Sequence, residues 1–486
     1  MLKLRDGRLV RVAPLASRCD DPSPRLLVSG RSLLASAWRP WVGFIAAAML
    51  ARAVVSFGLL GAMPLVSDAE AYAQEALGLL RELPPSKAFY WPPGNPFVLA
   101  FSYAALGQEV TSARVVTLLA GTISAVVAAL VANRLFHDRR AAIATGFLAA
   151  LYLPSVMLSA QPYSQHLAGL WLLLFAYWGL RASSEGRLAL YAGAGFAYGL
   201  GCLTRPSMLS VLPVLAVLVA KHVLEASDHT RRPWRGAALG LSIFAVAAGT
   251  CIGPVMAHNH AHQAGMVIST NNERNFFLGN NPYTPDYKTS QLAQRSFRDL
   301  DAEVQQYLKH FYQQPNSRAA MMSEALRFIR ERPVITLYRT WNRATSFWGF
   351  DYLSSRLIQA HTGVGHVGLL GLLALEAGSY LLVMALALIG LCCFAARMSR
   401  TWLLWLLALV VAYEVPYMIA FSGGTFHFPV MGLILPFAGG ALAELLASGG
   451  RARVWARLRA SRLAWCALAV LLLIQIEYAY QVIVMA

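Results

Sequence analysis

The chain has 486 residues, of which 57% are hydrophobic and 13% are charged; this balance excludes an ordinary soluble domain of that size. The formal net charge of +17 would suit a nucleic-acid-binding protein, but the basic residues stand in short clusters between apolar runs, as they do in loops that anchor membrane helices. We therefore predict an all-α polytopic membrane protein whose partner is the lipid bilayer and not a nucleic acid.

The first 40 residues are polar and rich in arginine, and we interpret 1–40 as a basic cytoplasmic leader. Eleven apolar runs then approach the roughly 20 residues that a membrane span needs. They lie at 41–64, 112–135, 141–158, 163–181, 188–204, 206–220, 236–257, 364–395, 401–421, 428–448 and 463–485. If the N-terminus is inside, all six basic clusters fall on the cytoplasmic side, as the positive-inside rule predicts. The prediction is a multi-pass protein of the bacterial inner membrane.

This topology divides the chain into parts. An N-terminal transmembrane module covers 41–257 and contains a first periplasmic loop at 65–111. A large periplasmic loop at 258–363 follows, and C-terminal transmembrane helices occupy 364–486.

Within the loops, several short segments are predicted to be helical. The apolar run 96–107 is too short to cross a bilayer and is predicted to lie at its surface. In the large loop, 290–312 and 317–332 are expected to form amphipathic helices. The aromatic and basic segment 334–350 suits a helix at the membrane interface.

The first periplasmic loop holds a cluster of acids in a chain that has few. Ser67, Asp68, Ala69 and Glu70 have the form of a capping box, in which Ser67 caps the helix and Glu70 reaches back. The same helix would place Asp68, Tyr72 and Glu75 on one face. A partly desolvated carboxylate near the membrane can act as a general base, although the spacing alone favours simple helix capping.

Two further features lie on the same predicted face. Tyr90 and Trp91 lead into Pro92-Pro93-Gly94-Asn95-Pro96, a stiff loop that is either a helix connector or a wall against a lipid or sugar. Arg205, followed by Pro206, interrupts two apolar runs. A charged residue in that position is a functional candidate, although it can also extend along the helix to reach the interface.

The large loop begins with histidines and continues with asparagines. His258, His260 and His262 alternate, but no carboxylate or cysteine cluster accompanies them, so a hydrogen-bonding role is favoured over metal binding. The segments 270–272 and 276–283 are rich in asparagine. Asn-Asn-Pro is typical of turns, and the amides would also suit sugar hydroxyl groups.

Taken together, these residues resemble one family, the bacterial GT-C membrane glycosyltransferases of the protein O-mannosyltransferase and aminoarabinose-transferase type. The resemblance runs over roughly 41–440 and rests on the order of several motifs. They are Asp68 with Tyr72, Pro92-Pro93-Gly94, Ala113-Arg114-Val115-Val116 leading to Arg134-Leu135-Phe136, Leu203-Thr204-Arg205-Pro206, the Asn-rich block at 270–282, Arg343 before Phe347-Trp348, and Phe426-His427-Phe428-Pro429.

The resemblance implies a GT-C-like bundle of about eleven transmembrane helices with periplasmic juxtamembrane helices. It implies an inverting transfer of a sugar from a dolichyl- or polyprenyl-phosphate carrier to a periplasmic acceptor. The first-loop aspartate acts on the acceptor in such enzymes, so Asp68 is the expected base, and Glu70 and Tyr72 complete the expected catalytic group. The expected substrate-binding residues are Arg205, Arg343, Arg274, Lys87, Asn280, Asn281, His258, His427, Tyr90 and Trp91.

The chain departs from the family pattern at three places. Ala160-Gln161-Pro162 stands where relatives often carry Ser-Glu-Pro, His258-Asn259 where they often carry Arg-Asn, and His427 lies in a less basic motif. The missing acid weakens a metal-assisted reaction, so we expect no cofactor and no metal ligands, with a divalent ion as the less favoured alternative.

Two other functions remain open at the sequence level. A polymerase or ligase of polyprenyl-linked glycans would share the same fold. A lipid-linked sugar transporter or flippase should place acids or broken helices at mid-membrane, where this chain has only Glu376 and Glu414.

Overall fold

The computed structural model describes residues 2–5, 8–11, 30–227 and 233–483, and it divides the chain into two units, 1–40 and 41–486. In the first unit β1 (Leu2–Arg5) pairs with β2 (Arg8–Arg11) in an antiparallel hairpin, with Leu2 opposite Arg11. The helix α1 (Gly30–Ala53) begins in this unit. Much of the predicted basic leader, 12–29, lies outside the described residues.

The second unit is helical, and seven of its described helices are long and apolar enough to cross a membrane. These are α1 with the π-helical turn η1 (Val54–Leu59), α4 (Val110–Phe136), α10 (Pro233–Ala261), α17 (His366–Phe394), α18 (Arg400–Ile419), α19 (Met431–Leu446) with the 3₁₀ turn η5 (Gly424–Val430), and α21 (Arg462–Ile483). The predicted multi-pass helical fold is therefore confirmed.

The predicted count of eleven spans is not confirmed. The other predicted spans correspond to shorter or less apolar helices: α5 (Arg139–Leu151), α6 (Leu153–Leu158), α7 (Ser164–Glu185), α8 (Leu188–Thr204), η2 (Pro206–Val211) and α9 (Leu212–Ser227). The run predicted at 141–158 is broken at Tyr152, whose backbone is extended. Pro154 starts the next helix there, because it cannot donate the hydrogen bond that a continuous helix needs.

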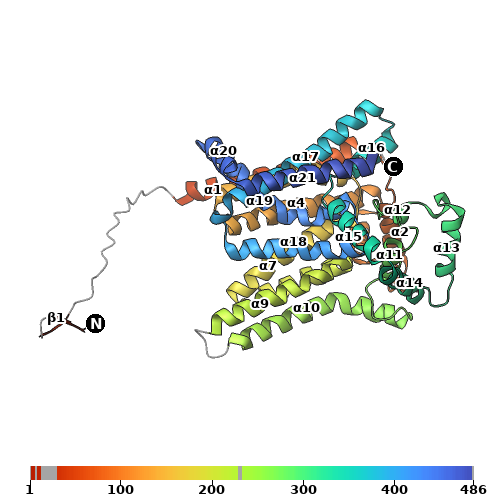
Figure 1. Cartoon of the computed structure of the whole chain (residues 1–486), viewed down its shortest axis with the longest axis horizontal. Helices are drawn as coiled ribbons and strands as arrows, with labels where there is room; N and C mark the ends of the chain where they lie inside the picture. The colour runs from red at the N-terminus through yellow and green to blue at the C-terminus, as the bar shows by residue number, and fades with distance from the viewer. Residues whose placement is uncertain (1, 6–7, 12–29, 228–232, 484–486) are drawn as a thin grey trace. The chain divides into compact units, whose positions relative to one another are not determined.

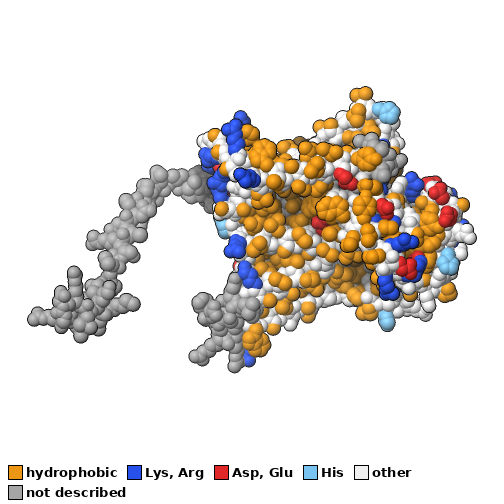
Figure 2. Space-filling view, viewed as in Figure 1, with side chains coloured by type: hydrophobic (Ala, Val, Ile, Leu, Met, Phe, Trp, Pro, Cys, Tyr) orange, Lys and Arg blue, Asp and Glu red, His pale blue; other side chains and the backbone are white. Residues whose placement is uncertain are grey.

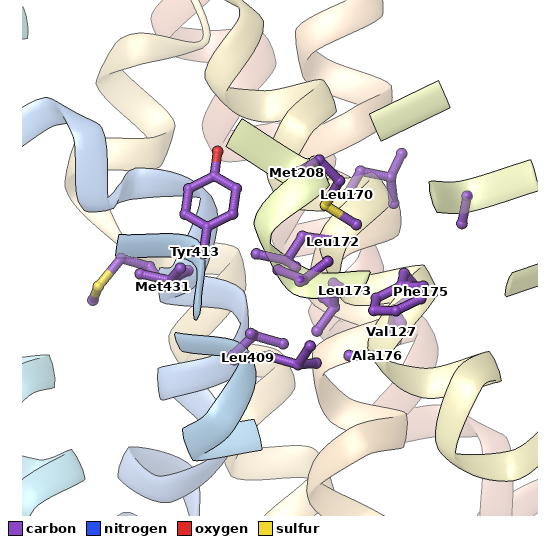
Figure 3. Close-up of a cluster of buried hydrophobic side chains, with 14 of the residues drawn as sticks. Val127, Leu170, Leu172, Leu173, Phe175, Ala176, Met208, Leu409, Tyr413 and Met431 are labelled. Carbon is purple, nitrogen blue, oxygen red and sulfur yellow. The ribbon is translucent and has the colours of Figure 1, made fainter. Parts of the chain in front are cut away.

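Large buried side chains hold these helices together. Figure 3 shows part of this core, in which Phe175 of α7, Met208 of η2, Leu409 and Tyr413 of α18 and Met431 of α19 converge. The core therefore joins helices from both halves of the sequence. Figure 2 shows hydrophobic side chains covering the long side of the unit between its two ends, as a lipid-facing surface requires.

The connecting segments form short helices at one end of the unit. They are α2 (Asp68–Arg81), α3 (Gly94–Leu106), α11 (Asn272–Gly279), α12 (Gln291–Gln294), η3 (Phe297–Asp299), α13 (Ala302–Tyr312), α14 (Ser317–Glu331), α15 (Pro333–Phe347) and α16 (Leu353–Thr362). Figure 1 shows α2 and α11–α14 gathered at this end, whereas α20 (Gly450–Ala460) lies at the other. The turn η4 (Ala395–Arg397) follows α17.

The prediction of a single helix at 290–312 is wrong, because the chain there forms α12, η3 and α13 in succession. The breaks bring Leu292 and Leu308 into one small core with Phe277 and Met321. This segment therefore has its own hydrophobic centre. The helices predicted at 317–332 and 334–350 correspond to α14 and α15.

Candidate active site

A cavity of about 590 Å³ opens among the short helices, and it is bounded by segments that are far apart in the sequence. The lining residues come from α2, α11, α12, α16, η2, η5, the loop before α3, the start of α7, and the ends of α8, α18 and α21. Five of the residues that the sequence marks as candidates are among them: Asp68, Tyr72, Trp91, Arg205 and Arg274. A hollow of this size accommodates a sugar with part of a lipid carrier.

Asp68 occupies the first turn of α2, but the capping box predicted around it is absent. Ser67 has φ 56° and ψ −132°, and its side chain makes no capping hydrogen bond. An N-cap residue normally has an extended backbone with φ negative, so this geometry turns the hydroxyl away from the helix. Glu70 is exposed and outside the lining. Ser67 itself lines the cavity beside Asp68.

The Asp68 carboxylate has no hydrogen-bond or ion-pair partner among the described residues, although it lines the cavity. Burial raises its pKa above the ordinary value of 3.8, and the nearby positive charge of Arg205 opposes that rise. A carboxylate that no donor satisfies, and whose basicity is increased, is a good acceptor for a proton from a ligand.

Tyr72 lies one turn after Asp68 and forms part of an aromatic wall. Its ring meets Trp91 edge to face, with centroids 5.7 Å apart, and Trp91 meets Tyr90 in the same way at 5.2 Å. Burial, and then the negative charge of Asp68, raise the pKa of Tyr72 to about 12. Tyr72 therefore stays a neutral phenol, which can donate a hydrogen bond but is a poor base at neutral pH.

Arg205 brings a positive charge to the same cavity. Its Nε donates to Ser164 Oγ at 3.0 Å and its Nη1 to the Tyr417 hydroxyl at 3.0 Å. The guanidinium also stands over the Phe426 ring at 5.6 Å. Its Nη2 has no partner among the described residues, so Arg205 is held in place by two contacts while donors remain for a ligand.

The loop before α3 is placed next to Arg205 by a close backbone contact. A Cβ on Gly94 would stand 2.7 Å from the carbonyl carbon of Leu203 and from the backbone nitrogen of Thr204. Only glycine allows the start of α3 to approach the end of α8 this closely. Because of this contact, the Pro-Pro-Gly motif and the Leu-Thr-Arg-Pro motif both line one cavity, although they are more than 100 residues apart.

Arg274 reaches the cavity from α11 and is tied to aromatic residues. It donates to the hydroxyl of Tyr90 and, from Nε at 3.2 Å, to the hydroxyl of Tyr312, whose ring it also covers at 5.2 Å. These contacts join the large loop to the loop before α3. Tyr90 is not among the lining residues and acts on the cavity through Arg274.

Arg343, Asn280 and Asn281 are fully buried and lie outside the cavity lining. Arg343 donates to the carbonyl oxygens of Gly279 and Ile419, and Asn280 Nδ2 also reaches the Ile419 carbonyl at 3.0 Å. Asn281 Nδ2 donates to the Phe277 carbonyl at 2.8 Å. Arg343 and Asn280 thus fasten the end of α11 to the end of α18, whereas Asn281 bonds back to α11. The Arg343 Nη groups also lie 3.3 Å from Asn280 Oδ1, and its buried Nε has no partner among the described residues.

Three other predicted ligands are also absent from the lining. Lys87 is exposed, and His258 Nε2 lies 3.0 Å from the Lys87 carbonyl oxygen. His427 is buried between the Phe347 carbonyl, at 2.7 Å from Nδ1, and Asp351 Oδ2, at 3.2 Å from Nε2. These three residues therefore lie outside the cavity that would hold a substrate.

Arg114 belongs to one of the family motifs in the sequence, but its role as a positioning residue was not predicted. Arg114 is buried and donates to the carbonyl oxygens of Ala160, Ser56, Gly61 and Met63, which holds the chain that leads into Asp68. The sequence signal for this role is a charged residue near the start of a long apolar run.

Gln161 explains one departure from the family pattern. Its Nε2 donates to the Pro64 carbonyl at 2.8 Å, and its Oε1 accepts from the Val66 amide at 3.2 Å. A glutamate could accept the second bond but could not donate the first. The neutral amide therefore fits this position because the segment before Asp68 offers it both an acceptor and a donor.

Asn259 plays a similar part for the segment that leads to α3. Its Oδ1 accepts from the Phe89 amide at 2.8 Å, while its Nδ2 donates to the carbonyls of Val267 and Ile268. The cavity wall also contains Tyr163, Tyr352, Tyr417 and Phe426, none of which was predicted as a site residue, although Phe426 lies in the Phe-His-Phe-Pro motif. Among the described residues, no group of three or more His, Cys, Asp or Glu side chains is placed to hold a metal ion.

Comparison with known proteins gives two findings. A model of the dolichyl-phosphate-mannose-protein mannosyltransferase family matches residues 91–248, about a third of the chain. The solved structure of arabinosyltransferase EmbB from Mycobacterium smegmatis is similar over 91% of this chain and 44% of that chain, with 13% sequence identity and a TM-score of 0.33. No curated protein sequence matches the chain. The family match confirms, for residues 91–248, the predicted resemblance to GT-C membrane glycosyltransferases.

Proposed function

We propose that the chain is an inverting glycosyltransferase that moves a sugar from a polyprenyl-phosphate carrier to an acceptor hydroxyl. One observation carries the proposal: the Asp68 carboxylate is unpaired and faces the same cavity as the Arg205 guanidinium. The reaction needs these two groups, a base for the acceptor and a cation for the departing phosphate. The match to the mannosyltransferase family over residues 91–248 supports the same class of reaction.

In the proposed step, Asp68 takes the proton from the acceptor hydroxyl as its oxygen attacks the anomeric carbon. The new carbon–oxygen bond forms on the face opposite the leaving group, so the configuration inverts. The bond from the anomeric carbon to the phosphate oxygen breaks, and its electron pair leaves with the lipid phosphate. Arg205, with Arg274 as a second cation, stabilises that charge through N–H donors that suit phosphate oxygens.

The walls of the cavity fit the remaining parts of the substrate. Trp91, with Tyr72 beside it, offers an aromatic face to a sugar ring. Asn271, Asn272 and Asn275 also line the cavity and offer amides to its hydroxyl groups. We place the cavity on the periplasmic face of the bacterial inner membrane, with the N-terminus in the cytoplasm and the segment 258–363 covering the site. This orientation follows from the basic clusters at the other end.

The proposal is tested by sugar transfer with the full-length protein reconstituted in lipid vesicles. The donors are a panel of radiolabelled polyprenyl-phosphate sugars, and Asp68→Asn is compared with the wild type. Asparagine keeps the shape of the side chain and removes the base, so we expect turnover to fall by about 10²–10⁴. Binding of the carrier and the thermal stability should be retained.

Glu70→Gln is the matched control, because Glu70 is an exposed acid in the same helical turn and lies outside the cavity. It should transfer sugar at the wild-type rate. A fully active Asp68→Asn variant would rule out the proposed base. Movement of the lipid-linked sugar across the bilayer without any transfer would replace the enzyme proposal with a transporter.

A further inference from the structure

A second cavity, of about 460 Å³, lies at the end of the helices opposite the candidate active site. It is formed where α4 ends and α5 begins, together with the ends of α17 and α19 and the start of α20. Three arginines from three separate segments line it: Arg140, Arg397 and Arg453. Figure 2 shows the Lys and Arg side chains that gather at this end.

Arg397 and Arg453 are oriented by one acid and keep donors for a ligand. Both donate to Glu444, Arg397 through Nη1 and Arg453 through Nε at 2.6 Å. Arg453 Nη1 also donates to the Ser448 carbonyl at 2.8 Å. The remaining N–H groups of the two guanidiniums have no partner among the described residues, so an anion in the cavity would find donors already held in place.

Arg140 supplies a cation that no acid neutralises. Within the described part of the chain, its guanidinium has no hydrogen bond or ion pair, although it lines the cavity. The carboxylate of Asp138 caps α5 by accepting from the Arg140 backbone amide at 2.8 Å. Asp138 is therefore occupied with the main chain, and the Arg140 side chain remains available.

The balance of charge indicates what kind of anion fits. Three arginines and the two acids Asp138 and Glu444 leave one positive charge in the lining when His137 is neutral. One positive charge matches a phosphodiester, which carries a single negative charge, better than a phosphate monoester, which carries about −1.5 to −2 at neutral pH. Phospholipid headgroups are phosphodiesters.

The surroundings of the cavity fit the edge of a bilayer. Large apolar side chains are exposed around α20. They are Leu446 at the end of α19, Trp455 within α20, and Leu463 and Trp465 at the start of α21. Exposed tryptophans beside arginines are typical of the headgroup level of a membrane. Part of the lining is apolar: the ring of Phe136 packs against α19 at Gly440, where a Cβ would overlap it.

From these observations we propose that the cavity binds the headgroup of an anionic phospholipid with one phosphodiester, such as phosphatidylglycerol. The phosphate accepts hydrogen bonds from Arg140, Arg397 and Arg453, and the acyl chains pass over the apolar surface beside α20. This site is independent of the proposed sugar transfer, because it lies at the other end of the helices.

Native mass spectrometry of the delipidated full-length protein tests the proposal. Phosphatidylglycerol is titrated against phosphatidylcholine with the same chains, and the wild type should bind the former more tightly. Arg140→Gln removes an unpaired cation and should weaken phosphatidylglycerol binding about tenfold. Arg451→Gln is the matched control, an exposed arginine on α20 outside the lining, and its affinity should stay within about twofold of the wild type, as expected for a solvated surface charge.

Asp138→Asn gives a second and opposite test. Asparagine caps a helix as well as aspartate does, so α5 should be kept while the cavity gains a positive charge. We expect phosphatidylglycerol to bind several-fold more tightly. Equal weakening by Arg140→Gln and Arg451→Gln would overturn the site and leave only diffuse surface charge. Equal competition by the soluble headgroup glycerophosphoglycerol would overturn the assignment to a lipid.

Discussion

Asp68 and Glu444 are acids at opposite ends of the helices, and they differ in the number of hydrogen-bond donors that reach each carboxylate. Asp68 has no donor among the described residues, and its charged neighbour Arg205 directs Nε to Ser164 and Nη1 to Tyr417. Glu444 accepts from both Arg397 and Arg453. Each acid lines a cavity.

The difference shows that a residue type in a cavity does not define its chemistry. A carboxylate with arginines on both oxygens is a weak proton acceptor, since those bonds favour its charged form. An unpaired carboxylate with a raised pKa remains available to a substrate. We therefore expect changes near Asp68 to affect catalysis, and matched changes near Glu444 to affect lipid binding.

Among changes that keep the Asp68 base, the largest effect should come from removing the cation beside it. Arg205→Gln should lower kcat/KM for sugar transfer by about 10²–10³, because one preorganised donor to the departing phosphate is worth about that factor. Arg397→Gln, the matched change at the other end, should transfer sugar at nearly the wild-type rate. If both variants remain folded and lose the same activity, the two cavities do not have separate functions.

A smaller effect should appear in the pH dependence of the reaction. Asp68 must be ionised to act as a base, and burial raises its pKa above 3.8. The value of kcat/KM should therefore fall as the pH decreases through that raised pKa, and the fall should begin at a higher pH than for an ordinary aspartate. In Arg205→Gln the fall of kcat/KM should begin at a still higher pH, because the positive charge that opposes the rise of the Asp68 pKa is gone. If kcat/KM falls at the same pH in the variant and the wild type, Arg205 does not lower the pKa of Asp68.

The smallest effect concerns Glu75, another acid on α2. Burial raises its pKa from 4.5 to about 7, and its Oε2 has no hydrogen-bond partner among the described residues. The folded state thus holds the proton more tightly than the unfolded state, and stability falls as the pH rises from about 4.5 to about 7. Glu75→Gln should raise the unfolding free energy at pH 8 by on the order of 1–3 kcal/mol, after allowance for partial exposure. The melting temperature at pH 8 should rise accordingly.

The same substitution should leave the melting temperature nearly unchanged at pH 4, where the wild-type carboxyl is protonated in both states. Glu70→Gln is the control, because Glu70 is exposed on the same helix, and it should show no comparable change with pH. A Glu75→Gln protein that is less stable at pH 8 would mean that the charged carboxylate has a partner.

The membrane character and the positions of most helices could be predicted from the sequence, because apolar length and charge clusters are local properties. The number of spans could not, since a break such as the one at Tyr152 depends on Pro154 and on packing against neighbouring helices. The choice of Asp68, Tyr72, Trp91, Arg205 and Arg274 as candidates was possible because each stands out locally. Their assembly into one cavity depends on contacts between distant segments, such as Gly94 with Leu203.

Arg343 shows why residue type alone does not identify a phosphate ligand. The same planar donors that suit a phosphate also suit carbonyl oxygens, and in this structure they bind Gly279 and Ile419. The sequence contains no signal that separates the two uses. The reverse holds for Arg114, which was named only as part of a motif although its contacts position the segment before Asp68.

The Arg114 contacts have a consequence for how this protein can vary. Since Arg114 binds main-chain oxygens of Gly61, Met63 and Ala160, it is sensitive to the path of the chain and less so to the side chains along it. Substitutions between Gly61 and Asp68 that keep the backbone path should be tolerated, whereas inserting or deleting one residue would shift Asp68 along α2 by about 100° of helical rotation. Homologous and engineered chains should therefore keep the length of this segment more strictly than its composition.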